Sequence, residues 1–218
     1  KYKGARIQVL DLPGIIEGAA GGRGRGRQVI GTARTCNLIL IVLDAGKPVT
    51  HKKIIEAELF GFGIRINQTP PNVKIMIKTS GGVGYQEAVP QTRGMNADVA
   101  RLICKEYKIS CAELILREDI TSDQFIDVIE GNRSYIPVLY VMNKIDAITI
   151  EELDILDQMP NYVPISSQHM WGLDELMEEI WERCNMIRIY TKPQGQTPDY
   201  DEPVILHDKN PSIEEFCN

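Results

Sequence analysis

Residues 136–146 form an apolar run that ends in a polar motif: Ile136-Pro137-Val138-Leu139-Tyr140-Val141-Met142-Asn143-Lys144-Ile145-Asp146. The apolar part predicts a buried strand of a parallel sheet. In an open α/β sheet, ligands bind beyond the carboxyl ends of the strands. The last four residues of the run are therefore expected at a binding edge.

The motif after this strand has the chemistry to recognise one nucleobase. The Asp146 carboxylate can accept two hydrogen bonds from the N1–H and the exocyclic amine of guanine. Adenine lacks that donor pair, and leaving the carboxylate unpaired would cost roughly 1–3 kcal/mol. Asn143 can donate and accept toward the other edge of the purine, and the stem of Lys144 can lie along the base plane. The same four residues also occur in ordinary surface turns, so the motif needs companions.

Two further motifs follow predicted strands. Asp11-Leu12-Pro13-Gly14 comes after a strand pattern at 5–10, and Ser166-Ser167 follows 163–165. Asp11 could hold a Mg²⁺-bound water, and the Gly14 N–H could approach a terminal phosphate, which a Cβ would hinder. The order of the three motifs matches the third, fourth and fifth motifs of GTP-binding domains. In that order, Ser166 and Ser167 would support the base.

The chain resembles the Obg-related GTPases and, within them, the developmentally regulated GTP-binding proteins. The resemblance begins with Asp11-Leu12-Pro13-Gly14-Ile15-Ile16-Glu17-Gly18-Ala19 and continues through 22–28, 36–44, 188–193 and 198–200. It implies an α/β fold: a Ras-like P-loop NTPase-type sheet with helices on both faces, a small α/β insert and the start of a ubiquitin-like TGS domain. The implied boundaries are 1–63 and 134–187 for the GTPase domain, 64–133 for the insert and 188–218 for the partial TGS domain.

The resemblance also implies an activity and partners. A member of this family would bind GTP and GDP with Mg²⁺, would leave room for a monovalent cation such as K⁺, and would hydrolyse GTP. It would act in the cytoplasm as a translation regulator associated with the ribosome or RNA and with a regulatory partner protein. Neither a membrane nor DNA is implied. The alternative is a ribosome- or partner-binding module that binds no nucleotide by itself.

Two departures from the GTPase pattern are visible. The phosphate-cradling G-x-x-x-x-G-K-[ST] loop does not occur in the chain, and neither does the family's Thr-bearing switch segment. Both are expected upstream of Lys1, and we expect the chain to be a fragment at both ends. Ile15 follows Gly14 where Ras-type enzymes place a Gln that orients the attacking water. No catalytic residue is therefore assigned, and slow intrinsic hydrolysis is expected; Ile15 could equally be a packing residue.

Two glycine-rich segments each allow two interpretations. The Gly/Arg segment 21–27 is either a switch loop whose arginines contact phosphate, RNA or a partner, or a flexible solvated loop. By position the switch is favoured. The segment Gly81-Gly82-Val83-Gly84 is either a phosphate-binding nest or a hairpin turn, and we expect the hairpin.

Composition narrows the class of protein. The 218 residues are 43% hydrophobic and carry a formal charge of −6, which disfavours a globally basic nucleic-acid binder but leaves room for a local basic patch. The five cysteines form no C-x-x-C pair and the three histidines are dispersed, so neither a zinc framework nor a disulfide pattern is expected. No signal peptide or long apolar run is present, which favours a reducing, cytosolic compartment.

Periodicity predicts the remaining elements. The run 38–43 reads as a central strand buried on both faces. Further strands are expected at 73–78, 112–116, 163–165 and 204–206. Helices are expected at 51–59, 96–107 and 173–184, with capping-box starts at Thr121 and Thr149.

Overall fold

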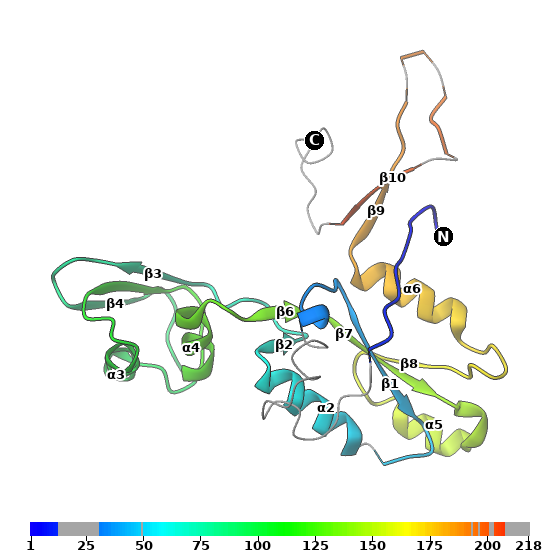
Figure 1. The fold of residues 1–218 in the computed structure, drawn as a ribbon, viewed down its shortest axis with the longest axis horizontal. Coiled ribbons are helices and arrows are strands. Elements are labelled where there is room, and N and C mark those ends of the chain that lie inside the picture. Colours follow the sequence, from blue (N-terminus) through cyan, green and yellow to red (C-terminus); the bar gives the residue numbers. More distant parts are fainter. Residues whose placement is uncertain (13–30, 49, 193, 196, 201–202, 208–218) are drawn as a thin grey trace. The chain divides into compact units, whose positions relative to one another are not determined.

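The computed structural model describes residues 1–12, 31–48, 50–192, 194–195, 197–200 and 203–207. The chain divides into two compact units, which are coloured along the sequence in Figure 1. Unit 1 comprises 1–62 and 136–218, and unit 2 comprises 63–135. Gly14, Ile15 and the Gly/Arg segment 21–27 lie outside the described residues.

Unit 1 contains a three-stranded parallel sheet. Its strands are β1 (Ile39–Asp44), β7 (Val138–Asn143) and β8 (Tyr162–Pro164), in the order β1-β7-β8. In β7 all five residues before Asn143 are buried, as the apolar run predicts. Because the strands are parallel, their carboxyl ends meet at one edge of the sheet.

Helices cover both faces of this sheet (Figure 1). On one face, α6 (Leu173–Arg183) packs Ile180 against Leu139 and Val141. On the other, α2 (Thr50–Gly61) buries Leu59, and Glu56 accepts a hydrogen bond from the Tyr140 hydroxyl. The fold is therefore of the α/β, P-loop GTPase type that the sequence predicts.

Two shorter helices continue the chain beyond β7. A 3-10 turn, η2 (Ile145–Ala147), leads to α5 (Ile150–Leu156). The predicted capping box is confirmed at α5, because Thr149 and Glu152 exchange side-chain-to-backbone hydrogen bonds. Each capping bond satisfies a backbone N–H that the first turn of a helix would otherwise leave unpaired.

Two strand predictions in unit 1 are wrong. The segment 5–10 forms no strand, and Val9 is 78% exposed. Alternating residues favour a strand, but a strand also needs a hydrogen-bonded neighbour, and among the described residues this segment has only an isolated bridge between Ala5 and Tyr2. The run 38–43 forms a strand at the edge of the three-stranded sheet instead of at its centre, and Val42 is 60% exposed as a result.

Unit 2 has its own mixed sheet and its own core. Its strands are β3 (Val73–Ile77), β4 (Val83–Glu87) and β5 (Ala112–Leu116), with α3 (Ala97–Glu106) and α4 (Ser122–Glu130) packed against them and a short ladder of β2 (Ile64–Ile66) and β6 (Ser134–Ile136). The predicted helix starts are confirmed. Asn96 caps α3, and Thr121 forms a reciprocal capping box with Gln124 on α4.

The turn at Gly81 and Gly82 is not a hairpin. β5 lies between β3 and β4, antiparallel to β3 and parallel to β4. The turn therefore joins two strands that flank a third. Both glycines have positive φ angles, +105° and +73°, a conformation that side chains with a Cβ rarely adopt.

The end of the described chain forms a two-stranded antiparallel ribbon in unit 1. Its strands are β9 (Met186–Ile189) and β10 (Val204–His207), and β10 confirms the strand expected at 204–206. None of the helices in the described residues combines the length and apolarity that spanning a bilayer requires.

Candidate guanine-binding site

The carboxyl edge of the unit 1 sheet gathers the polar residues that follow its strands. Asp44 at the end of β1 is in register with Asn143 at the end of β7. Ser166 follows β8 closely, and the Ile165 N–H donates to the carbonyl of Met142. Two of the predicted motifs, the one at 143–146 and Ser166-Ser167, therefore lie together.

Asn143 connects these two motifs. Its side-chain oxygen accepts hydrogen bonds from the backbone N–H of Lys144 at 2.8 Å and from that of Ser167 at 3.0 Å. With its oxygen engaged twice, the amide can offer its NH₂ group to a ligand. Asn143 is thus oriented as a donor toward an acceptor such as a purine ring nitrogen.

Asp146 is held by Ser166. Ser166 is completely buried, and its hydroxyl donates to Asp146 Oδ1 at 2.5 Å, while the Ser166 Oγ accepts from the His169 N–H at 3.2 Å. The hydrogen bond from Ser166 is the largest effect on the Asp146 carboxyl and lowers its pKa, so the group is ionised at neutral pH. A carboxylate has about four acceptor positions. One is used by Ser166, which leaves enough for a pair of donors on guanine.

The loop after β8 is tightly constrained. Ser166 and Trp171 exchange two backbone hydrogen bonds of 3.1 Å, and the rings of His169 and Trp171 stack with centroids 5.0 Å apart. Gly172 has a φ angle of +69°, and a Cβ there would lie 2.3 Å from the carbonyl oxygen of Pro164. Only glycine fits this position without displacing backbone, and the loop is thereby fixed behind Asp146.

Lys144 makes an ion pair that the sequence analysis missed. Its Nζ lies 2.8 Å from Asp44 Oδ2, and the Gly46 N–H donates to Asp44 Oδ1 at 3.1 Å. The hydrogen bond between the two side chains raises the pKa of Lys144 and lowers that of Asp44. Lys144 itself has a left-handed backbone with a φ angle of +69°. Its ammonium is anchored to β1, while the role of its stem against a base stays a prediction.

Among the described residues, no hydrogen bond or ion pair connects Asp11 to this arrangement. Asp11 is exposed and directly precedes Leu12, the last described residue before the gap at 13–30. Gly14 and Ile15 fall in that gap. Among the described residues, no group of three or more His, Cys, Asp or Glu side chains is arranged to hold a metal ion.

Asp44, His169, Trp171 and Gly172 join the site although the sequence analysis did not assign them to it. Asp44 could have been assigned to the site from the sequence, because it ends an apolar strand just as Asn143 does. His169 Nε2 lies 4.0 Å from Asp146 Oδ2, a proximity created by the turn after Ser166. A lone histidine in a loop gives no pattern that would reveal such a contact.

Comparison with known proteins matches most of the chain. A family profile described as 50S ribosome-binding GTPase matches residues 1–78, and one described as the C-terminal region of the MMR_HSR1 domain matches 80–186. The chain is 59% identical to the developmentally-regulated GTP-binding protein 1 homolog of Dictyostelium discoideum and 58% identical to guanylate binding protein 128up of Drosophila melanogaster. It is 53% identical to ribosome-interacting GTPase 1 of Saccharomyces cerevisiae.

The chain belongs to the developmentally regulated GTP-binding proteins. Each of these three alignments covers all of the chain and 59% of the relative. The chain thus spans somewhat more than half of the length of these three relatives. Its resemblance to the Obg-related GTPases, first visible around Asp11, is confirmed by these matches.

Proposed function

We propose that this protein binds GTP at the carboxyl edge of the unit 1 sheet and hydrolyses it to GDP as a regulatory GTPase. The observation that carries the proposal is the connection of Asn143 to Ser167 and of Asp146 to Ser166. These bonds fix an amide donor and an ionised carboxylate on the same edge. Guanine presents the complementary acceptor and donor pair, which adenine does not.

Asp11 and Gly14 would serve the phosphate end of the nucleotide. Asp11 would hold Mg²⁺ through a water, and the Gly14 N–H would approach the terminal phosphate. In nucleotide sites, Mg²⁺ is bound by one or two carboxylates together with phosphates and waters. A single exposed aspartate such as Asp11 is therefore enough as the ligand from the protein. A monovalent cation such as K⁺ could assist. With Ile15 in place of a water-orienting Gln, hydrolysis by the protein alone would be slow.

The full-length protein would act on translation through the ribosome or its RNA, in the cytoplasm and with a regulatory partner protein. The names of a family profile and of the yeast relative support this association. In this proposal unit 1 supplies the GTPase domain, unit 2 is the insert, and the β9–β10 ribbon opens a TGS domain. No role at a membrane or on DNA is proposed.

Titration of labelled GTP and ATP into the full-length protein tests the base assignment. We expect GTP to bind at least about 100-fold more tightly, because a site built to pair with polar groups leaves buried groups unpaired when they are missing. Release of inorganic phosphate, measured with and without K⁺, tests hydrolysis. Equal affinity for the two nucleotides would refute the guanine assignment.

Asp146→Asn should weaken GTP binding by about 100-fold or more, since two charge-assisted hydrogen bonds of roughly 1.5–3 kcal/mol each are affected. The asparagine NH₂ can donate to the C2 carbonyl of xanthine, so xanthosine triphosphate should bind the variant better than GTP does. Asp154→Asn, the same change on an exposed position of α5, is the matched control and should leave both affinities unchanged.

A second candidate is a binding module that associates with the ribosome or a partner and uses nucleotide only as a switch. The observation that favours it is the separate compact fold of unit 2, which carries none of the guanine-site residues. Ribosome co-sedimentation with and without a GTP analogue distinguishes the candidates. Sedimentation that does not depend on nucleotide, together with an absence of phosphate release, would favour the module.

A further inference from the structure

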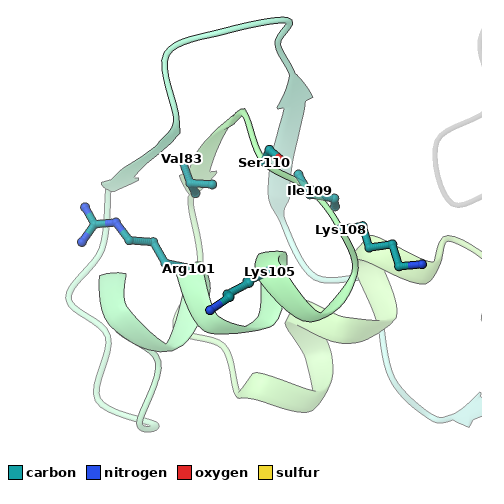
Figure 2. A pocket seen from close by; sticks show the side chains of 6 residues that line it. All are labelled: Val83, Arg101, Lys105, Lys108, Ile109 and Ser110. Atoms are coloured by element: carbon teal, nitrogen blue, oxygen red, sulfur yellow. The ribbon is translucent and has the colours of Figure 1, made fainter.

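Unit 2 has a basic hollow on its surface, away from the residues of the guanine site in sequence and chemistry. The hollow has a volume of about 310 Å³ and is lined by Val83, Arg101, Lys105, Lys108, Ile109 and Ser110 (Figure 2). Three of these six residues are cationic, and none is acidic. In a chain whose formal charge is −6, such a concentration of positive charge calls for a physical explanation.

The cations of the hollow are poorly neutralised within unit 2. Arg101 contacts Asp98 at 3.4 Å, but the side chain of Asp98 is 96% exposed, and such pairs contribute little. The ammonium groups of Lys105 and Lys108 have no ion-pair or hydrogen-bond partner among the described residues. Elsewhere in the unit the cations at Arg65, Lys78 and Arg133 are paired with carboxylates.

The spacing of the cations forms a stripe. Arg101 and Lys105 stand at positions i and i+4 of α3, with an axial step of about 6 Å between them, and Lys108 follows in the turn after the helix, where it has a left-handed φ of +58°. Their charged ends point in different directions and do not converge on one spot (Figure 2). A single phosphate would need convergent donors, whereas an extended polyanion can meet each cation separately.

The rest of the lining suits a ligand that is not purely ionic. Val83 and Ile109 are half-buried apolar residues, and the Ser110 hydroxyl can donate or accept a hydrogen bond. Sugar and base surfaces of a single strand can rest on apolar side chains while phosphates meet lysines.

We propose that the Arg101–Lys105–Lys108 stripe and its hollow bind the phosphodiester backbone of single-stranded RNA. This proposal rests on the ribosome association proposed above and assigns it a surface on unit 2. Backbone binding of this kind depends on charge and carries no sequence preference of its own. It is independent of the guanine site, because none of the lining residues belongs to that site.

The alternative explanation is structural. Cations near the carboxyl end of a helix interact favourably with the helix dipole, and Lys105 lies in the last turn of α3. That effect needs no ligand and would account for Lys105. It does not account for Arg101, which lies mid-helix, or for the hollow beside it. The two explanations make different predictions for RNA binding.

The test is anisotropy of a short labelled single-stranded RNA titrated with the full chain across about 50 to about 200 mM salt. Three backbone contacts should give a slope of log K against log salt of about −2 from this site, at roughly −0.7 for each contact. The double variant Lys105→Gln/Lys108→Gln should weaken binding about tenfold or more at low salt and make the slope less steep by about 1.4. GTP affinity should not change.

The matched control is Lys74→Gln/Arg117→Gln, which removes the same charge from the same unit. Both residues are exposed and lie toward the opposite end of the β3–β5 ladder from Ala112, the strand partner of Val83. Weaker RNA binding in the first pair but not in the second supports the proposal. Equal weakening in both pairs, unaffected binding in both, or no binding of RNA by the wild-type chain overturns it.

Two further comparisons distinguish RNA binding at the hollow from binding of an acidic peptide there and from RNA binding elsewhere in the chain. Polyglutamate that competes as well as RNA would identify an acidic-peptide site and overturn the RNA assignment. Any RNA binding by the Gly/Arg segment 21–27 would be common to all variants and cannot produce a difference between them. If GTP binding fails while RNA binding responds as expected, the nucleotide proposal is wrong and this one stands.

Discussion

Unit 2 and the candidate guanine-binding site of unit 1 both depend on charged side chains, but they use them in opposite settings. The site is called the corner below and comprises Asp44, Asn143, Lys144, Asp146 and Ser166 with the loop that follows Ser166. In unit 2, Arg65 and Asp127 form a two-point ion pair in which each side chain is 5% exposed, and Arg133 adds a third hydrogen bond. In the corner, the pair of Lys144 and Asp44 has side chains that are 61% and 24% exposed. Buried charges hold a core together, whereas exposed ones remain available to a ligand.

The difference determines what each pair can contribute. A buried pair is costly to form, but removing one partner leaves the other charge uncompensated and destabilises a fold by about 3–5 kcal/mol. An exposed pair competes with water and salt and contributes little to stability. We therefore expect loss of the buried ion pair in unit 2 to act on folding and loss of the exposed ion pair at the corner to act on binding.

The largest expected effect is that of Asp127→Asn, which leaves the buried Arg65 without its counter-charge. We expect a loss of about 3–5 kcal/mol in the stability of unit 2. Both tryptophans, Trp171 and Trp181, lie in unit 1, so urea unfolding followed by fluorescence reports on that unit and far-UV circular dichroism on both. An early transition should appear in the dichroism and not in the fluorescence.

The control for this change is Asp154→Asn, on an exposed face of α5. It should alter neither transition by more than about 0.5 kcal/mol. A variant of Asp127 that unfolds like the wild type would show that the buried pair is dispensable. Burial of the ion pair would then not explain the difference expected between unit 2 and the corner.

Gly172→Ala should have the next largest effect, and it acts on the corner through packing. The new Cβ would lie 2.3 Å from the Pro164 carbonyl oxygen at a φ of +69°, so backbone must move. A loss of about 1–3 kcal/mol in the stability of unit 1 is expected. Because the loop fixes Ser166 behind Asp146, the affinity for GTP should fall as well.

Gly46→Ala serves as the comparison for Gly172→Ala, since it lies near the same edge. Its added Cβ would meet Asp44 Oδ1 at 3.6 Å, an ordinary contact, and Gly46 has no positive φ. Tryptophan fluorescence and GTP titration should separate the two alanine variants. If both behave alike, the close approach at Pro164 relaxes without consequence.

Acid should weaken unit 2 by a smaller amount. Burial alone would raise the pKa of Asp127, but hydrogen bonds from Arg65 and Arg133 outweigh it and lower the pKa below its usual value near 3.8. The unfolded state therefore binds more protons than the folded state between the two pKa values, and stability increases with pH across that range. The contribution is complete above pH about 4 and is lost as pH falls through the folded pKa.

Urea unfolding measured by dichroism at pH about 5 and at pH about 3 checks this expectation. The early phase should move to lower urea in the acid sample. In Asp127→Asn the same phase should be much less sensitive to pH. A wild-type phase that gains stability in acid would contradict the sign of the argument.

The elements that could be predicted from sequence are those specified locally. Two helix starts are specified by the capping boxes at Thr121 and Thr149, and α6 is specified by its own apolar periodicity. Each of these signals depends only on residues a few positions apart. The motif at 143–146 was identifiable because a strand places it at a sheet edge. What failed depended on partners distant in the chain. The alternating residues of 5–10 have no neighbouring strand in the described structure, and the hairpin expected at 81–84 does not form because β5 lies between β3 and β4.

The pair of Asp44 and Lys144 belongs to the same category, because its residues are 100 positions apart and meet only through the parallel register of β1 and β7. Sequence reasoning could identify each residue at a strand end. It could not determine that they would meet, because register between distant strands follows from the packing of the whole sheet.

The smallest expected effect is that of Asp44→Asn. Since the Lys144 side chain is mostly exposed, the stability of unit 1 should be unchanged, while release of the ammonium from β1 should weaken GTP binding by about twofold. The effect should disappear at about 1 M salt, where exposed charges are screened. GTP titration at low and high salt measures both points. A loss of GTP affinity above about tenfold would mean that Asp44 contributes to recognition of the base as Asp146 does. The exposure of an ion pair would then no longer predict how much its loss costs.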